Sequence, residues 1–153
     1  MSIAKRAEMG IMAGILGCVA MGVAIVAVTA ISVVWNGFFP IQWFPWVGAL
    51  FGSSGIPSQV AEVGLAWSVA ISIIIGLIYA FLFKTHTVGQ GLAFGALAWF
   101  LLALYTALYT APQLSGPLGT LGYTMGAELL FPLAICLGIW GATMGYVGEK
   151  YLG

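Results

Sequence analysis

Residues 58–83 read SQVAEVGLAWSVAISIIIGLIYAFLF, a run in which Glu62 is the only charged side chain. The hydrocarbon core of a bilayer is about 30 Å thick, and about 20 apolar residues in an α-helix cross it with every backbone polar group bonded inside the segment. This run therefore predicts a membrane-spanning helix. Three other runs have the same character, and the four predicted spans cover residues 9–34, 58–83, 89–110 and 123–147. Together they predict an all-α membrane protein, a bundle of four transmembrane helices forming one domain over residues 1–153.

The composition agrees with a membrane protein and excludes several other classes. The chain is 62% apolar and 5% charged, whereas a soluble domain is about 45–50% apolar and about 25% charged. A soluble globular domain and a disordered chain are therefore excluded. The formal net charge is zero, so no basic surface is available for nucleic acid. The lipid bilayer is the partner that this composition predicts.

The basic residues predict how the spans are oriented. Lys5 and Arg6 precede the first predicted span, Lys84 lies between the second and third, and Lys150 follows the fourth. All four then fall on one side, which the positive-inside rule makes cytoplasmic. We expect cytoplasmic N and C termini in a multi-pass protein of the cell membrane, with a prokaryotic plasma membrane as the simplest assignment. The first apolar run is longer than the roughly 7–15 residues of a signal-peptide core, so we expect it to be retained as a span.

The connection between the first two predicted spans is rich in aromatic residues. Residues 35–57 read WNGFFPIQWFPWVGALFGSSGIP, too aromatic for a solvated loop and too broken by Pro and Gly for a span. Trp35, Trp43 and Trp46 suit the headgroup zone, where a ring is half wet. We expect a short interfacial helix or a partly re-entrant segment on the outer leaflet. It serves either as a lid over the bundle or as a docking surface for a partner or a lipid.

Small residues recur at intervals of four within the spans, a spacing that lets helix backbones approach closely in lipid. The predicted packing positions are Gly10, Gly14, Gly64, Ser68, Ser72, Gly76, Gly91, Gly95, Gly141 and Gly145. A weak internal repeat is present as well, because GIMAGILG at residues 10–17 resembles GLAFGALA at residues 91–98. A duplication of this kind relates the two helical hairpins by an axis along the membrane normal.

Glu62 and Glu128 are the candidate polar site, because each lies about one turn inside the outer end of its predicted span. One interpretation makes them first-turn acids that face headgroup water and the helix N-terminus. The other brings them together as an ion or proton site, with Tyr105 and Tyr109 at the same depth. Pro132 favours the second interpretation, since it leaves the Glu128 carbonyl without a helical hydrogen bond.

Other chemistry has little support in the sequence. His86 is the only histidine, which excludes a bis-histidine haem and leaves no set of zinc ligands. Cys18 and Cys136 are interpreted as packing residues, with a disulfide or metal pair as the alternative. Paired-aspartate catalysis is excluded, because the chain contains no Asp. We expect no catalytic residues, no metal site and no enzymatic activity, and the sequence identifies no cofactor.

A first span rich in glycine, GLIYAF at residues 76–81 and GLAFGALAWF at residues 91–100 resemble the small four-span inner-membrane proteins of unknown activity of the YagU type. The resemblance implies a four-helix layout and no particular reaction. Where that type has histidines at the outer starts of the even spans, this chain has Glu62 and Glu128.

Two functional hypotheses follow. The first is a structural or accessory subunit of a larger membrane complex, associated with other membrane subunits or with copies of itself. The second is a small homo-oligomeric transporter or a proton- or cation-coupled channel that uses Glu62 and Glu128.

Overall fold

The computed structural model describes residues 2–36, 43–53, 55–105 and 127–152, and every regular element in these ranges is helical. Helix α1 covers Ile3–Asn36, α2 Trp43–Leu50, α3 Pro57–Leu82, α4 Val88–Tyr105 and α6 Ala127–Leu152. Within these described ranges, three stretches are long and apolar enough to cross a membrane, namely Ile3–Ile31, Ser58–Leu82 and Val88–Tyr105. The predicted all-α membrane class is therefore confirmed at this level.

The helix boundaries differ from the predicted spans at several ends. Helix α1 begins at Ile3 rather than residue 9, so the charged residues before the apolar run already belong to the helix. Helix α6 continues to Leu152, beyond the predicted end at residue 147. The last five residues of the third predicted span and the first four of the fourth lie outside the described residues. The helices are longer than the predicted spans because charged residues can continue a helix beyond the apolar run that crosses the bilayer.

Local sequence signals explain where the shorter elements start and stop. Helix α2 ends in a Schellman motif, in which the Ser53 N–H donates to the Gly48 carbonyl and Gly52 adopts a φ of 81°. Helix α3 begins with Pro57 in its first turn, where no backbone donor is needed. Thr87 caps α4, because its hydroxyl accepts a hydrogen bond from the Gln90 N–H at 3.2 Å.

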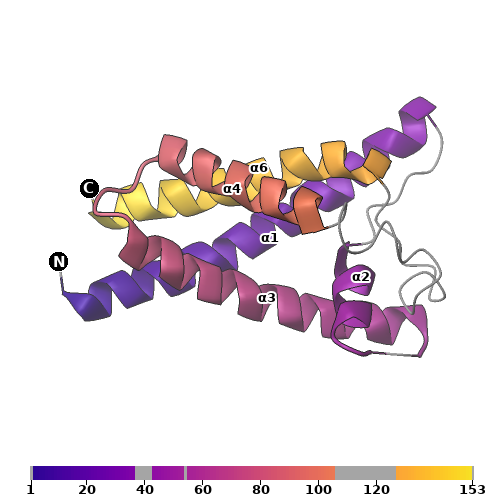
Figure 1. Cartoon of the computed structure of the whole chain (residues 1–153), viewed down its shortest axis with the longest axis horizontal. Helices are drawn as coiled ribbons and strands as arrows, with labels where there is room; N and C mark the ends of the chain where they lie inside the picture. The colour runs from indigo at the N-terminus through magenta and orange to yellow at the C-terminus, as the bar shows by residue number, and fades with distance from the viewer. Residues whose placement is uncertain (1, 37–42, 54, 106–126, 153) are drawn as a thin grey trace.

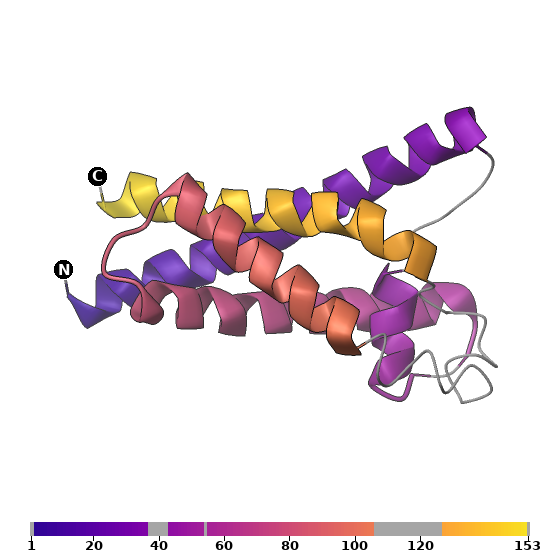
Figure 2. The ribbon, with the colours of Figure 1, turned by 45° about the horizontal axis from the view of Figure 1, so that its top comes forward.

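The helices form two antiparallel hairpins that lie side by side (Figures 1 and 2). Extensive contacts join α1 to α3, α4 to α6, α1 to α6, and α2 to α3. Both chain ends and the α3–α4 connection lie at one end of the bundle, and α2 lies toward the other (Figure 1). We call these the inner and the outer end.

Within each hairpin, the two helices pack through glycines at matching positions. A Cβ added to Gly14 of α1 would lie 2.5 Å from the Ser72 carbonyl oxygen of α3. A Cβ added to Gly95 of α4 would lie 2.5 Å from the Leu137 carbonyl oxygen of α6. One turn earlier, Gly10 faces Gly76 as Gly91 faces Gly141. The equivalent positions of the sequence repeat thus make equivalent contacts.

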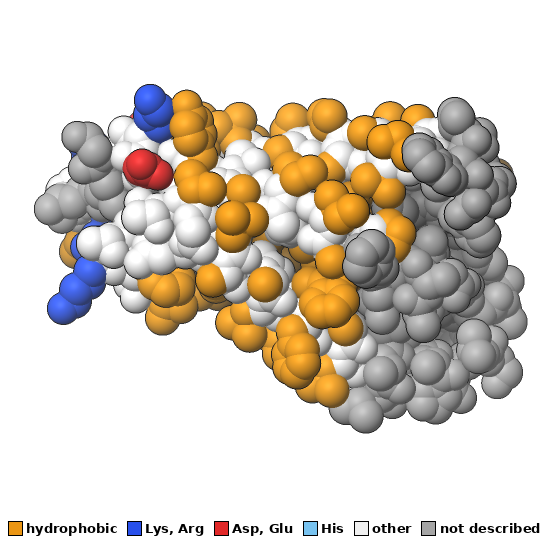
Figure 3. Space-filling view, turned by 90° about the horizontal axis from the view of Figure 1, so that it is seen from above, with side chains coloured by type: hydrophobic (Ala, Val, Ile, Leu, Met, Phe, Trp, Pro, Cys, Tyr) orange, Lys and Arg blue, Asp and Glu red, His pale blue; other side chains and the backbone are white. Residues whose placement is uncertain are grey.

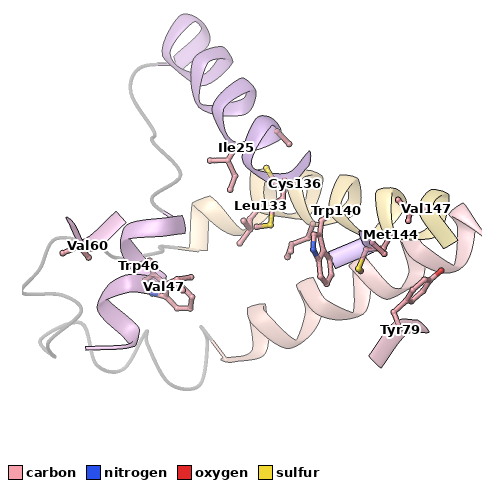
Figure 4. Close-up of a cluster of buried hydrophobic side chains, with 14 residues drawn as sticks. Ile25, Trp46, Val47, Val60, Tyr79, Leu133, Cys136, Trp140, Met144 and Val147 are labelled. Atoms are coloured by element: carbon pink, nitrogen blue, oxygen red, sulfur yellow. The ribbon is translucent and has the colours of Figure 1, made fainter. Parts of the chain in front are cut away.

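Buried apolar side chains fill the bundle between these hairpins. Tyr79, Leu133, Cys136 and Met144 are fully buried, and Trp140 lies among them (Figure 4). The face of the bundle seen in Figure 3 also exposes many apolar side chains, and Lys and Arg side chains gather at the inner end. An apolar surface on a bundle that already has an apolar core is typical of a protein surrounded by lipid.

Candidate functional site

A cavity of about 240 Å³ lies inside the bundle and is bounded by all five described helices. Its lining is apolar except for two serine hydroxyls. The lining residues are Cys18 and Met21 of α1, Trp43, Phe44 and Val47 of α2, Ser68, Ile71, Ser72 and Ile75 of α3, Ala98 and Leu102 of α4, and Leu137 and Trp140 of α6.

Helix α2 closes the outer end of this cavity. It approaches α3 so closely that a Cβ on Gly64 would lie 2.8 Å from the Gly48 nitrogen. The Trp43 indole N–H donates to the Ser68 hydroxyl oxygen at 3.2 Å. Trp46 lies edge-on to Tyr105 of α4, with ring centroids 6.5 Å apart. The prediction of a short helix in this connection is therefore confirmed, whereas its interfacial position and its role as a lid stay predictions.

A cluster of aromatic rings lies on the inner side of the cavity, next to the lining residue Trp140. Tyr79 of α3 and Phe94 of α4 have ring centroids 5.4 Å apart, and Phe94 stacks on Trp140 at 6.2 Å. Phe83 completes the group, 5.2 Å from Tyr79. Beyond this cluster, helices α3 and α4 make no extensive contact within the described residues.

Ser72 joins three helices on the wall of the cavity. The Trp140 indole N–H donates to the Ser72 hydroxyl oxygen at 2.8 Å. That hydroxyl in turn donates to the Gly14 carbonyl at 2.8 Å. Helices α1, α3 and α6 are therefore linked by a short chain of hydrogen bonds. A buried indole N–H needs a partner, which explains a serine at this depth.

The predicted polar site is only partly visible among the described residues. The Glu62 side chain is exposed on α3 and does not line the cavity. Glu128 belongs to α6, but its side chain lies outside the described residues, as does all of Tyr109. Tyr105 contacts Trp46 of the lid. Convergence of the two glutamates therefore stays a prediction.

The inner end contains buried polar groups that the sequence did not suggest. His86 and Tyr79 are both buried, with ring centroids 5.1 Å apart. Within the described ranges, the Tyr79 hydroxyl, both His86 ring nitrogens and the Gln90 side-chain oxygen have no hydrogen-bond partner. Burial lowers the pKa of His86, and the charge of Arg6 lowers it further; the Tyr79 and Ala80 backbones lie close enough to oppose this shift, although neither makes a well-formed hydrogen bond to the ring. His86 is therefore a neutral, buried side chain rather than a solvated loop residue.

The cysteines are free and buried, and Cys18 lines the cavity while Cys136 belongs to the core. No group of three or more potential metal ligands occurs within the described ranges. Sequence reasoning missed Trp140, whose indole N–H bonds to Ser72, and it did not foresee that the Trp43 N–H bonds to Ser68. A tryptophan in the middle of a predicted span was the available signal, because its N–H must be bonded away from water.

No protein-family model, curated protein or solved structure matches this chain. The site is therefore interpreted from its own geometry.

Proposed function

We propose that the chain is a four-span integral membrane protein with α6 as its fourth span and both termini in the cytoplasm of a prokaryotic cell. Helix α6 has 26 residues, as many as α3, and it packs along both α1 and α4. The four basic residues lie in or beside the inner-end segments, which supports a cytoplasmic inner end by the positive-inside rule. The YagU-type resemblance is consistent with this layout.

Within that layout, we infer that the protein is a non-catalytic structural or accessory subunit of a larger membrane complex. The observation that supports this is the poor coverage of α4. Only 11% of its membrane window is buried inside the chain, against 39% for the α1 window and 28% for the α3 window. Its exposed face combines large residues, such as Leu97 and Phe100, with the small residues Ala93 and Ala96. Small side chains let a partner helix approach closely in lipid.

The direct test is gentle extraction from the native membrane, followed by a native gel and mass spectrometry of the band. We expect a particle much larger than 16.0 kDa that contains other membrane subunits. A stable single chain without companions would contradict the proposal.

A pair of matched variants tests whether α4 forms the contact. We expect Ala93→Phe to release the chain from the larger particle, because the added ring blocks the close approach of a partner helix. Ala27→Phe makes the same change on the exposed face of α1 and should leave the particle intact. Equal behaviour of the two variants would remove α4 from the interface.

A transporter or ion-coupled channel is the second candidate, and one observation favours it. Glu62 is an exposed carboxylate within the Ser58–Leu82 stretch, and a charged group on a lipid-facing surface is costly unless something covers it. In this proposal a second copy of the chain covers Glu62, and the ion path lies between copies. Proton flux into liposomes should then fall in Glu62→Gln and Glu128→Gln. Unchanged flux in both variants would exclude the two glutamates from transport.

A further inference from the structure

The cavity lies where one of two equivalent extensive contacts between the hairpins is missing among the described residues. Helix α1 packs along α6, and the internal repeat relates α1 to α4 and α3 to α6. The equivalent contact would therefore join α3 to α4. No extensive contact between these two helices is formed in the described part of the chain. Helix α2 occupies their outer end instead, so the cavity is a consequence of the topology and not of one small side chain.

The shape of the cavity indicates from where a ligand enters. Tyr79 and Phe94, each one helical turn beyond the lining residues Ile75 and Ala98, pack together toward the inner end, with ring centroids 5.4 Å apart. Trp43 and Val47 of α2 cover its outer end. Between these closures, the residues on α3 from Ser68 to Ile75 extend over about 10 Å along the helix axis. Because α3 and α4 make no extensive contact within the described residues, the side between them is left as the approach from the lipid.

The lining selects the chemistry of the ligand. Apolar cavities hold no ordered water, because water needs two to four polar partners. The Ser72 hydroxyl is already donating to Gly14 and accepting from Trp140, and the Ser68 hydroxyl oxygen accepts from Trp43. An engineered apolar cavity of roughly 150 Å³ binds benzene, and this cavity, at about 240 Å³, is larger. Among bilayer components, an alkyl chain fits an elongated apolar space of this kind.

We propose that the cavity binds one acyl chain of a membrane phospholipid, which enters sideways between α3 and α4 below α2. The headgroup stays at the outer membrane surface, since the packed rings of Tyr79, Phe83 and Phe94 lie on the inner side of the cavity. The bound chain supplies the packing contacts that α4 would otherwise have made with α3. This inference is independent of whether the protein has partner subunits.

The wild-type chain provides the first test. It is reconstituted into dioleoyl phosphatidylcholine vesicles that contain a small fraction of phosphatidylcholine with a mid-chain diazirine, and the photolysed residues are mapped by mass spectrometry. We expect labels on cavity residues such as Ile71 and Leu137, in addition to outward residues such as Val26 and Leu97. Labels confined to outward residues would overturn the proposal. Two other results would also overturn the proposal. One is that a free fatty acid with a diazirine labels the cavity and the phospholipid does not; the other is that added polyprenol removes the phospholipid label from the cavity.

Two matched variants give an independent test. Ala98→Phe places a ring in the cavity from α4, whereas Ala70→Phe places the same ring on the exposed face of α3. The ratio of cavity label to outward label should fall about tenfold in Ala98→Phe, in proportion to a typical overpacking penalty. The ratio should be unchanged in Ala70→Phe. An unchanged ratio in both variants would overturn the proposal, and the wild-type map decides the matter if Ala98→Phe does not fold.

Discussion

Ser72 has the most consequential environment of any single residue in the bundle, because its hydroxyl bonds to two other helices. It donates to Gly14 of α1 and accepts from Trp140 of α6, both at 2.8 Å. In a soluble protein, water would compete for these groups. In lipid, no such competitor is present, so loss of one partner leaves the other unbonded.

We predict that Ser72→Ala lowers the free energy of unfolding by about 1–3 kcal/mol, because it leaves the Trp140 N–H buried and unpaired. In a chain that already carries Trp140→Phe, Ser72→Ala should cost less, because the hydrogen bond is already lost. The expected coupling energy is about 0.6–1.7 kcal/mol, the range measured for hydrogen bonds between membrane helices. Reversible unfolding in mixed micelles measures all the variants of the cycle. Ser58→Ala, on the exposed side of α3, is the control and should change little. Strict additivity in the cycle would contradict the hydrogen bond.

His86 predicts a dependence of stability on pH. Burial lowers the pKa of the folded chain's imidazole below the ordinary value of 6.5. The unfolded chain therefore binds the proton at a higher pH than the folded chain does. Stability from this residue is present above about pH 6.5 and is lost as the pH falls through the window below that value.

The measurement is the free energy of unfolding between pH 5 and 7.5, compared between wild type and His86→Gln. We expect the wild type to lose stability on acidification and the variant to show a flatter profile. A steeper acid loss in His86→Gln than in the wild type would show that the sign is wrong.

At the scale of the element, the strictest need for glycine is where two helix backbones meet. A Cβ on Gly14 would lie 2.5 Å from the Ser72 carbonyl oxygen, and a Cβ on Gly95 would lie 2.5 Å from that of Leu137. A Cβ on Gly138 of α6 would meet nothing within 4 Å. Glycine content alone does not separate these cases, since all three residues lie inside apolar helices.

We predict that Gly14→Ala and Gly95→Ala each destabilise the protein by about 1–3 kcal/mol, because the contacted atoms are backbone and cannot rotate away. Gly138→Ala should be neutral or stabilising by up to about 1 kcal/mol, the difference in helix propensity. Similar costs at Gly14 and Gly95 would support the equivalence of the two hairpins. A cost at Gly138 as large as at Gly14 would contradict the close-approach explanation.

At the scale of the whole molecule, the proposed topology makes one prediction about sidedness. Both termini and the α3–α4 connection share the inner end (Figure 1). Reporter fusions at residue 153 and within residues 84–87 should both be active in the cytoplasm, and a fusion within residues 51–56 should be active outside. Replacing Lys5 and Arg6 by Gln should increase the fraction of chains with the opposite orientation. A cytoplasmic signal from residues 51–56 would exclude the proposed topology.

The sequence by itself determined the features that depend on local composition. Length and hydropathy predicted the three spans that the structure describes, and the spacing of Gly10, Gly14, Gly91 and Gly95 anticipated positions that lie in helix contacts. The aromatic connection also predicted a short helix or a re-entrant segment, because aromatic residues such as Trp43 and Trp46 are a local signal. These properties belong to one segment at a time, so no tertiary information was needed.

Only the tertiary structure decided which side chains meet. It turned Glu62 outward, buried His86 beneath Tyr79, and selected Ser72 as the partner of Trp140. It also packed α2 against α3, beside a cavity that all five described helices line. In a chain that is apolar on every face, the hydrophobic pattern does not identify the inward side of a helix. That choice is made by close packing and by the pairing of a few polar groups, which arise only when the helices come together.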